Sequence, residues 1–167
     1  SLAVGLIDAT FERVGNDDSA EDGHYGVTGW LKKHLTFSKG KATIRYVGKS
    51  GVKHEKVVTD SKLVSALRGC CDDKKPDDAI LSFGAEDTDG PVKITSRDVN
   101  EYLKPFEVTA KDLRGFHANR EMQERLRAIR KKGPELPRAR KEKDEILKKE
   151  FKQALEETAA EVGHESS

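Results

Sequence analysis

The apolar positions follow two different periods along the chain. Over residues 2–14 they recur at helical spacing, and Gly15 is suited to end such a helix. From about residue 33 to 58 the period becomes two, which predicts three strands, at 34–37, 42–47 and 52–58. A Lys39–Gly40 turn and a Gly-rich segment at 48–51 separate these runs. The pattern therefore predicts a helix followed by a small antiparallel meander.

The remaining apolar positions predict helices that begin at capping residues. The expected starts are Asp60 or Ser61, Thr95 or Ser96, and Thr109, which forms a capping box with Asp112. The helix opened by Thr109 extends to about Lys132, and 133–137 breaks it. A last helix, ending at Gly163, carries on one face Ile146, Leu147, Phe151, Leu155 and Val162. The expected fold class is α+β, mainly α-helical with a small three-stranded antiparallel sheet.

Composition limits the size of the core and the kinds of partner. The 167 residues correspond to one domain on length alone. Hydrophobic residues make up 35% and charged residues 37%, so the core must be assembled from a few amphipathic faces. The net charge is only +1, although residues 125–143 are strongly basic. A basic run of this kind is typical of a solvated helix face, so charge alone does not identify a polyanion partner.

Several classes of function are disfavoured by motif spacing. The adjacent Cys70 and Cys71 indicate reduced thiols and an intracellular compartment, the cytoplasm or nucleoid. We expect no metal site and no membrane span, because zinc-type spacing and long apolar runs are lacking. Gly48-Lys49-Ser50 is not a P-loop, since Thr43 replaces the required glycine and a strand follows. We therefore expect no nucleotide.

Four short motifs place a cationic or protonatable side chain beside a turn or helix start. These side chains are Arg13, Lys49, Arg114 and His164. Arginine forks bind phosphate oxygens, and a helix start such as that before Arg114 favours an anion. Taken singly, Arg114 is also compatible with a surface salt bridge to Asp112 or Glu107, and Arg13 with compensation of a helix dipole. Together, without paired carboxylates, they indicate a site that surrounds a phosphodiester and supplies a proton.

Five segments, read in order, resemble the catalytic domain of type IB DNA topoisomerases, particularly its poxviral and bacterial branch. They are RVGN (13–16), YGVTGWLKKHL (25–35), YVGKSGVKH (46–54), TAKDLRGFHAN (109–119) and VGH (162–164). Tyrosine recombinases share the general plan, but their second arginine usually lies in an HxxR motif. Here Lys111 occupies the first position of that motif, which favours the topoisomerases.

The resemblance implies a role for each matching residue. Arg13 and Arg114 would bind non-bridging oxygens of the scissile phosphate, and Lys49 would be the general acid toward the leaving 5′ oxygen. His164 would donate a hydrogen bond in the transition state. The residues expected to hold the backbone of duplex DNA are Lys32, Lys33, Lys111 and Arg120, together with the basic stretch.

The resemblance also implies a domain organisation. Residues 1–167 would be a single, partial catalytic domain that lacks the N-terminal DNA-clamping domain and the segment carrying the nucleophilic tyrosine. The parent protein would be a monomeric isomerase that relaxes DNA through a 3′-phosphotyrosyl intermediate without cofactor or metal. The fragment alone is expected to be inactive.

Three other functions remain open from the sequence. A tyrosine recombinase or integrase would exchange strands between two specific sites. A catalytically inactive DNA-binding module would bind duplex DNA in a salt-dependent way without a covalent adduct. A purely structural helical protein would leave the four phosphate-type motifs unexplained.

Overall fold

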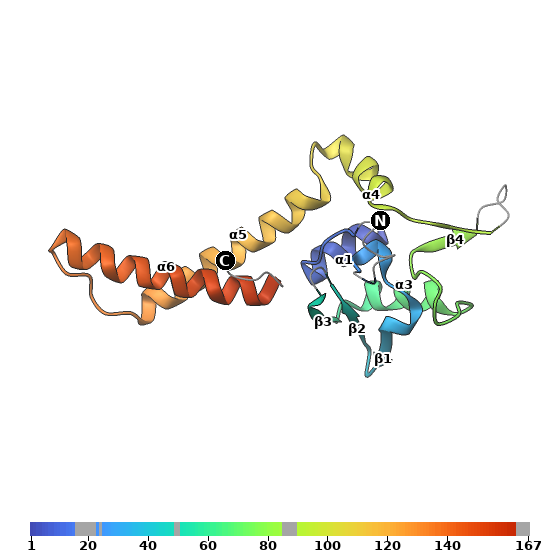
Figure 1. Ribbon diagram of the computed structural model, residues 1–167, viewed down its shortest axis with the longest axis horizontal. Coiled ribbons are helices and arrows are strands. Elements are labelled where there is room, and N and C mark those ends of the chain that lie inside the picture. The colour runs from blue at the N-terminus through green and yellow to red at the C-terminus, as the bar shows by residue number, and fades with distance from the viewer. Residues whose placement is uncertain (16–22, 24, 49–50, 85–89, 163–167) are drawn as a thin grey trace. The chain divides into compact units, whose positions relative to one another are not determined.

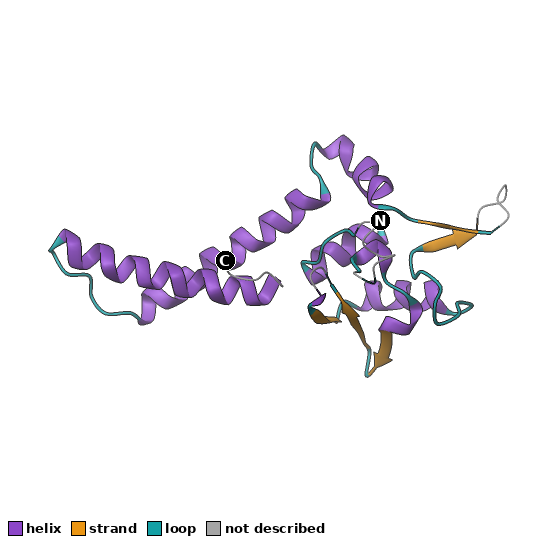
Figure 2. Ribbon diagram, in the orientation of Figure 1, coloured by secondary structure: helices purple, strands orange, loops and turns teal. Residues whose placement is uncertain are grey.

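The computed structural model describes residues 1–15, 23, 25–48, 51–84 and 90–162 (Figure 1). The chain divides into two compact units, Ser1–Arg114 and Gly115–Ser167. Helices predominate in both units, and the strands belong to the first (Figure 2). No helix in the described ranges is long and apolar enough to cross a membrane. The expected fold class, mainly α-helical with a small antiparallel sheet, is confirmed.

The first unit contains the predicted meander. Strands β1 (Leu35–Ser38), β2 (Lys41–Val47) and β3 (Lys53–Val58) form an antiparallel sheet in that order. Lys39 and Gly40 both have positive φ in the first turn, as the sequence predicted. In the second hairpin, Val47 pairs with Lys53 and Tyr46 pairs with His54. Helix α1 (Leu2–Thr10) precedes the sheet, with single 3-10 turns η1 (Val27–Gly29) and η2 (Lys32–His34) between them.

The predicted capping residues start the following helices. Asp60 accepts a hydrogen bond from the Leu63 N–H at 2.9 Å and begins α3 (Ser61–Cys71). Thr95 forms a capping box with Asp98 at the start of α4 (Ser96–Leu103), and η4 (Lys104–Phe106) follows. A two-stranded sheet of β4 (Ser82–Gly84) and β5 (Pro91–Lys93) was not predicted. Three-residue strands are too short to show a period of two.

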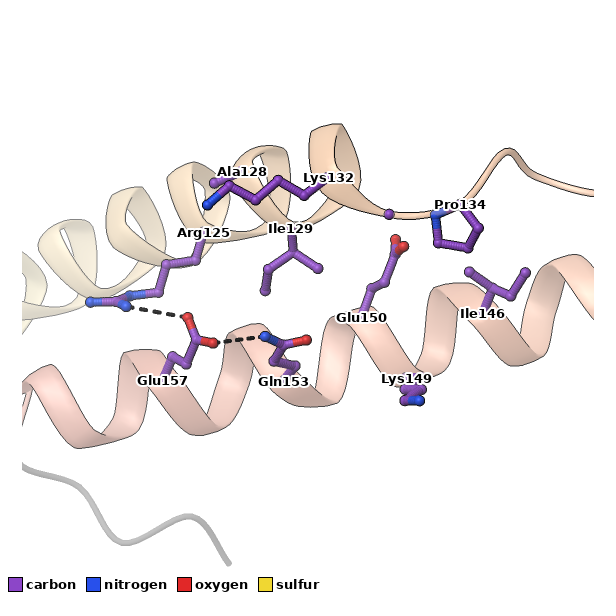
Figure 3. A pocket seen from close by; sticks show the side chains of 11 residues that line it. Arg125, Ala128, Ile129, Lys132, Pro134, Ile146, Lys149, Glu150, Gln153 and Glu157 are labelled. Atoms are coloured by element: carbon purple, nitrogen blue, oxygen red, sulfur yellow. Dashed lines mark hydrogen bonds and ion pairs between the residues drawn. The ribbon is translucent and has the colours of Figure 1, made fainter.

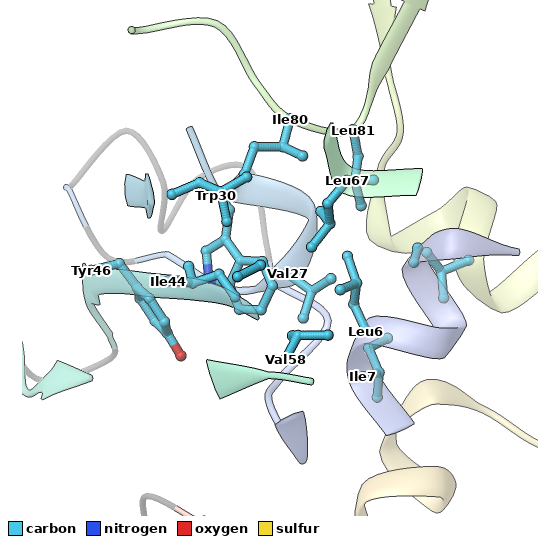
Figure 4. Packing of buried hydrophobic residues seen from close by; sticks show 14 of the residues in the cluster. Leu6, Ile7, Val27, Trp30, Ile44, Tyr46, Val58, Leu67, Ile80 and Leu81 are labelled. Carbon is cyan, nitrogen blue, oxygen red and sulfur yellow. The ribbon is translucent and has the colours of Figure 1, made fainter. Parts of the chain in front are cut away.

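The core of the first unit lies between the meander and helices α1 and α3. Trp30 is fully buried, and Figure 4 shows it beside Ile44 and Val27. Leu6 and Ile7 of α1 complete the cluster together with Val58, Leu67, Ile80 and Leu81. Packing of this kind fixes the end of α1 against strand β3 and thereby positions the residues that follow α1.

The second unit is a pair of helices joined largely by charged side chains. Helix α5 (Ala110–Lys132) begins in the first unit, and α6 (Arg140–Val162) pairs with its later turns. Arg125 Nη1 lies 3.4 Å from Glu157 Oε2, at the edge of a groove of about 560 Å³ (Figure 3). Arg130 Nη1 lies 2.6 Å from Glu150 Oε1, whose residue is buried.

The apolar face of α6 is not the face that is buried. Phe151 is 53% exposed and Leu155 is 46% exposed, whereas Glu150, Ala154 and Thr158 are buried. The face of α6 that packs on α5 is the one that carries the ion-pairing carboxylates and the small Ala154. The larger apolar side chains lie on another face and stay exposed. Hydrophobic periodicity alone therefore gave the helix but not its packed surface.

Candidate functional site

Arg114 is positioned by the capping box that opens α5. The Thr109 N–H and Oγ1 donate to Asp112 Oδ2 at 2.9 and 2.7 Å, and the Asp112 N–H donates to Thr109 Oγ1 at 3.3 Å. These hydrogen bonds lower the pKa of Asp112 and commit its carboxylate to the cap. The Arg114 Nε instead donates to the main-chain oxygen of Phe11 at 2.8 Å. The side chain is thus directed to the end of α1.

Arg13 lies immediately after the end of α1. The helix stops at Thr10 because Phe11 adopts a left-handed conformation, with φ of 57°. The chain then runs beside residues 27–28, where the Val27 N–H donates to the Arg13 oxygen at 2.9 Å. A Cβ on Gly26 would lie 2.5 Å from the Gly15 Cα. The glycines of the RVGN and YGVTGW motifs therefore permit the close contact that fixes the backbone at Arg13.

The end of α1 brings the two predicted arginines together. Arg114 is half-buried, and burial is the first cause that lowers its pKa. The second cause is the positive charge of Arg13, so the two guanidinium groups lie within electrostatic range of each other. Two like charges held close together in a partly buried place are suited to bind an anion with several oxygens. Their role in binding a phosphodiester stays a prediction.

The predictions for Lys49 and His164 fall outside the described residues. Lys49 belongs in sequence to the segment between β2 and β3, and the structure describes the chain on either side of residues 49–50. There the Gly48 N–H donates to the Val52 oxygen at 2.7 Å. A Cβ on Gly48 would lie 2.5 Å from two ring atoms of His54, so the strand packs directly on that ring.

The predicted DNA-contacting residues are distributed over both units. Lys32 Nζ donates to the main-chain oxygen of Cys71 at 2.7 Å, so its ammonium already has a structural contact. Lys33 forms an exposed ion pair with Asp77 at 2.7 Å, which is worth little in water. Lys111 on the first turn of α5 and Arg120 farther along it are exposed. Their role in binding DNA stays a prediction.

Sequence reasoning missed a buried polar cluster beside the arginines. Glu12 is only 4% exposed, and its Oε2 lies 3.8 Å from both His54 Nδ1 and Lys56 Nζ. Tyr46 stacks on His54 with ring centroids 5.2 Å apart. The two-residue period of β3 could have indicated this cluster, because His54 and Lys56 lie on the same face of the strand as the buried Val58.

Comparison with known proteins agrees with the motif resemblance. The family model described as the catalytic core of eukaryotic DNA topoisomerase I matches residues 1–167. The DNA topoisomerase 1B of Acanthamoeba polyphaga mimivirus is 29% identical over an alignment of 178 positions, which covers 98% of this chain. The DNA topoisomerase I of monkeypox virus and the DNA topoisomerase 1B of vaccinia virus (strain Western Reserve) are each 33% identical over 88 residues, 52% of this chain.

The relatives are longer than the chain. The chain covers 48% of the mimivirus protein and 25% of each of the two poxviral proteins. The motifs predicted a resemblance to type IB topoisomerases, particularly to their poxviral and bacterial branch. These matches confirm the family and support the poxviral-like branch. Because the family model matches the whole chain, the chain belongs to the DNA topoisomerase I catalytic-core family.

Proposed function

We propose that this chain forms the DNA-cleaving core of a type IB topoisomerase, which relaxes supercoiled duplex DNA by cutting and resealing one strand. The observation that carries the proposal is the junction at Phe11. There Arg114, from the start of α5, binds the Phe11 oxygen, two residues before Arg13, and the charge of Arg13 acts on the Arg114 guanidinium. The family membership supports the same assignment.

In the proposed reaction a tyrosine hydroxyl attacks the scissile phosphorus and gives up its proton. The phosphorus–oxygen bond to the 5′ oxygen breaks, that oxygen takes a proton, and a 3′-phosphotyrosyl ester forms. Attack by the 5′ hydroxyl then re-forms the original bond, releases the tyrosine and returns its proton. The ester retains the energy of the broken bond, so the cycle needs no nucleotide hydrolysis.

The nucleophile belongs to a segment after His164, according to the family resemblance. Tyr46 is an unsuitable nucleophile although it lies near the arginines. Its side chain is buried, and burial together with the negative charge of Glu12 raises its pKa. The hydroxyl is therefore held in its neutral form and away from solvent.

Each site residue has one proposed role. Arg13 and Arg114 bind the non-bridging oxygens, where negative charge is concentrated in a phosphoryl transition state. Lys49 protonates the leaving 5′ oxygen, and His164 donates a hydrogen bond to the phosphorane oxygens. Lys32, Lys33, Lys111 and Arg120 contact the DNA backbone, which sets position without reading sequence.

The proposed working state is a monomer on duplex DNA, in a compartment that keeps thiols reduced. Cys70 and Cys71 are both free thiols, and burial raises the pKa of each. A raised pKa disfavours the reactive thiolate, which suits cysteines without a redox role.

Covalent trapping tests the function. The complete natural protein that contains residues 1–167 is incubated with supercoiled DNA in EDTA, and the reaction is stopped with detergent. We expect a protein–DNA adduct at a 3′ end, and relaxed DNA when detergent is omitted. Chain 1–167 alone and the Arg114→Ala variant of the complete protein are the controls, and both should give no adduct.

The other outcomes assign the alternatives. Strand exchange between two specific sites would identify a recombinase. Salt-dependent duplex binding without an adduct from the complete protein would identify a catalytically inactive binding module and would reject the proposed activity.

A further inference from the structure

Glu12 is a buried carboxylate directly beside the arginine pair. It follows Phe11, which binds Arg114, and precedes Arg13 in the chain. Its Oε1 accepts a hydrogen bond from the Arg13 N–H at 3.0 Å. No hydrogen bond reaches its Oε2 from any residue in the described part of the chain. An ionised carboxylate in this position is costly unless nearby positive charge stabilises it.

The positive charge comes from strand β3 as well as from the arginines. Lys56 Nζ and His54 Nδ1 each lie 3.8 Å from Glu12 Oε2, and their side chains are 13% and 10% exposed. Burial lowers the pKa of His54, and the charges of Lys56, Arg114 and Arg13 oppose the raising effect of Glu12. His54 is therefore mainly neutral near pH 7, and Lys56 is the nearest lasting cation on the strand.

Glu12 also acts electrostatically on Arg114. Burial and the charge of Arg13 both disfavour the charged guanidinium, whereas the charge of Glu12 favours it. The carboxylate thus lies against Lys56 of β3 and favours the positive charge of Arg114 on α5, and the charge of its chain neighbour Arg13 also acts on Arg114. These cations would repel one another in the absence of DNA.

We propose that Glu12 is a positioning residue of the phosphodiester site, the counter-charge that holds Arg13, Arg114 and Lys56 together before DNA is bound. This inference rests on the function proposed above. The carboxylate does not touch the reacting atoms. It favours the arrangement that the transition state needs, and it weakens rather than strengthens binding of the anionic backbone. Its loss should therefore slow cleavage without weakening DNA binding.

The first test measures the arginine itself and needs no activity. In chain 1–167 labelled with ¹⁵N-arginine, hydrogen exchange of the Arg114 Nε–H reports its bond to the Phe11 oxygen. Glu12→Gln keeps the shape and an oxygen for the Arg13 N–H, and it removes only the charge. We expect the Arg114 Nε–H to exchange about 10-fold faster or more in this variant. Glu55→Gln is the matched control, because Glu55 is an exposed carboxylate on β3, the strand that carries Lys56, and it pairs with Arg45.

The second test measures single-turnover cleavage and DNA affinity in the complete natural protein. We expect Glu12→Gln to slow cleavage about 10-fold while the Kd for intact duplex stays the same or falls. The double variant Glu12→Gln/Lys56→Met removes both partners and should recover part of the cleavage rate. A deleted pair is tolerated better than a lone buried charge.

Each remaining outcome overturns the inference. Unchanged exchange in Glu12→Gln would show that Arg114 does not depend on this charge. Equal losses of rate and affinity, without recovery in the double variant, would assign Glu12 to the general fold, as would failure of both variants to fold. If the unaltered protein forms no adduct, the proposed function fails, and the exchange experiment alone still decides whether Glu12 positions Arg114.

Discussion

Arg114 is proposed to bind phosphate oxygens with a guanidinium that is held at the end of α1. Its Nε donates to the Phe11 oxygen at 2.8 Å. Lysine has a single ammonium and cannot reproduce both functions. We expect Arg114→Lys to slow single-turnover cleavage about 10²–10³-fold while DNA affinity changes much less. Single-turnover rates and Kd values at one salt concentration measure the two effects separately.

Arg45→Lys is the matched control for this substitution. Arg45 is an exposed arginine on β2 that pairs with Glu55, so its replacement should leave both values near those of the unaltered protein. Equal losses of rate and affinity in Arg114→Lys would show instead that Arg114 is an anchor for the DNA backbone.

Individual residues of the candidate site could be predicted from the sequence only where they belong to a local motif. Arg13 and Arg114 were predicted from their motifs, and the structure brings them together. The hydrogen bond from Arg114 to the Phe11 oxygen was not predictable, because nothing in the sequence signals a left-handed phenylalanine. Glu12 was missed for a related reason. Its burial results from contacts with β3, which lies about forty residues away along the chain.

At the scale of the element, the capping box at Thr109 links the stability of α5 to the orientation of Arg114. Thr109→Ala removes the hydroxyl that accepts from the Asp112 N–H and donates to its carboxylate. We expect the free energy of unfolding to fall by about 1 kcal/mol, the usual effect of losing an N-cap. Chemical denaturation followed by circular dichroism measures this change.

The control for the capping prediction is Ser65→Ala, which replaces an exposed hydroxyl inside α3. Alanine favours a helix interior, so this variant should be no less stable than the unaltered chain. If Thr109→Ala unfolds at the same denaturant concentration as the control, the cap does not stabilise the fold.

Elements were predictable where short-range rules determine them. The meander follows from a period of two with turn residues between the runs, and Asp60, Thr95 and Thr109 start helices as their capping chemistry requires. Helix α6 shows the limit of such rules. Its buried face is chosen by ion pairs such as Arg130–Glu150, and a hydrophobic pattern cannot indicate polar contacts between distant segments.

At the scale of the whole molecule, two partly buried histidines make the stability of the first unit depend on pH. Burial lowers the pKa of both His34 and His54. His34 Nδ1 also accepts the Leu31 N–H at 3.1 Å, which requires that nitrogen to be unprotonated. In the unfolded chain both side chains take up a proton below about pH 6.5. The unfolded state then binds more protons, so the free energy of unfolding decreases as the pH falls.

The expected loss begins near pH 6.5 and continues down to the pKa values of the folded state. Each histidine contributes a slope of up to about 1.4 kcal/mol per pH unit. The Thr95 and Thr109 hydrogen bonds lower the pKa values of Asp98 and Asp112, so those carboxylates add their own loss only at more acidic pH. Trp30 is the single tryptophan and is fully buried in this unit, so its fluorescence in urea titrations at pH 7.5 to 5.0 follows the change.

The control variant is His34→Asn, which keeps an oxygen near the Leu31 N–H but does not titrate. It should reduce the slope of the unfolding free energy against pH. An equal slope in both proteins would show that His34 does not carry this dependence.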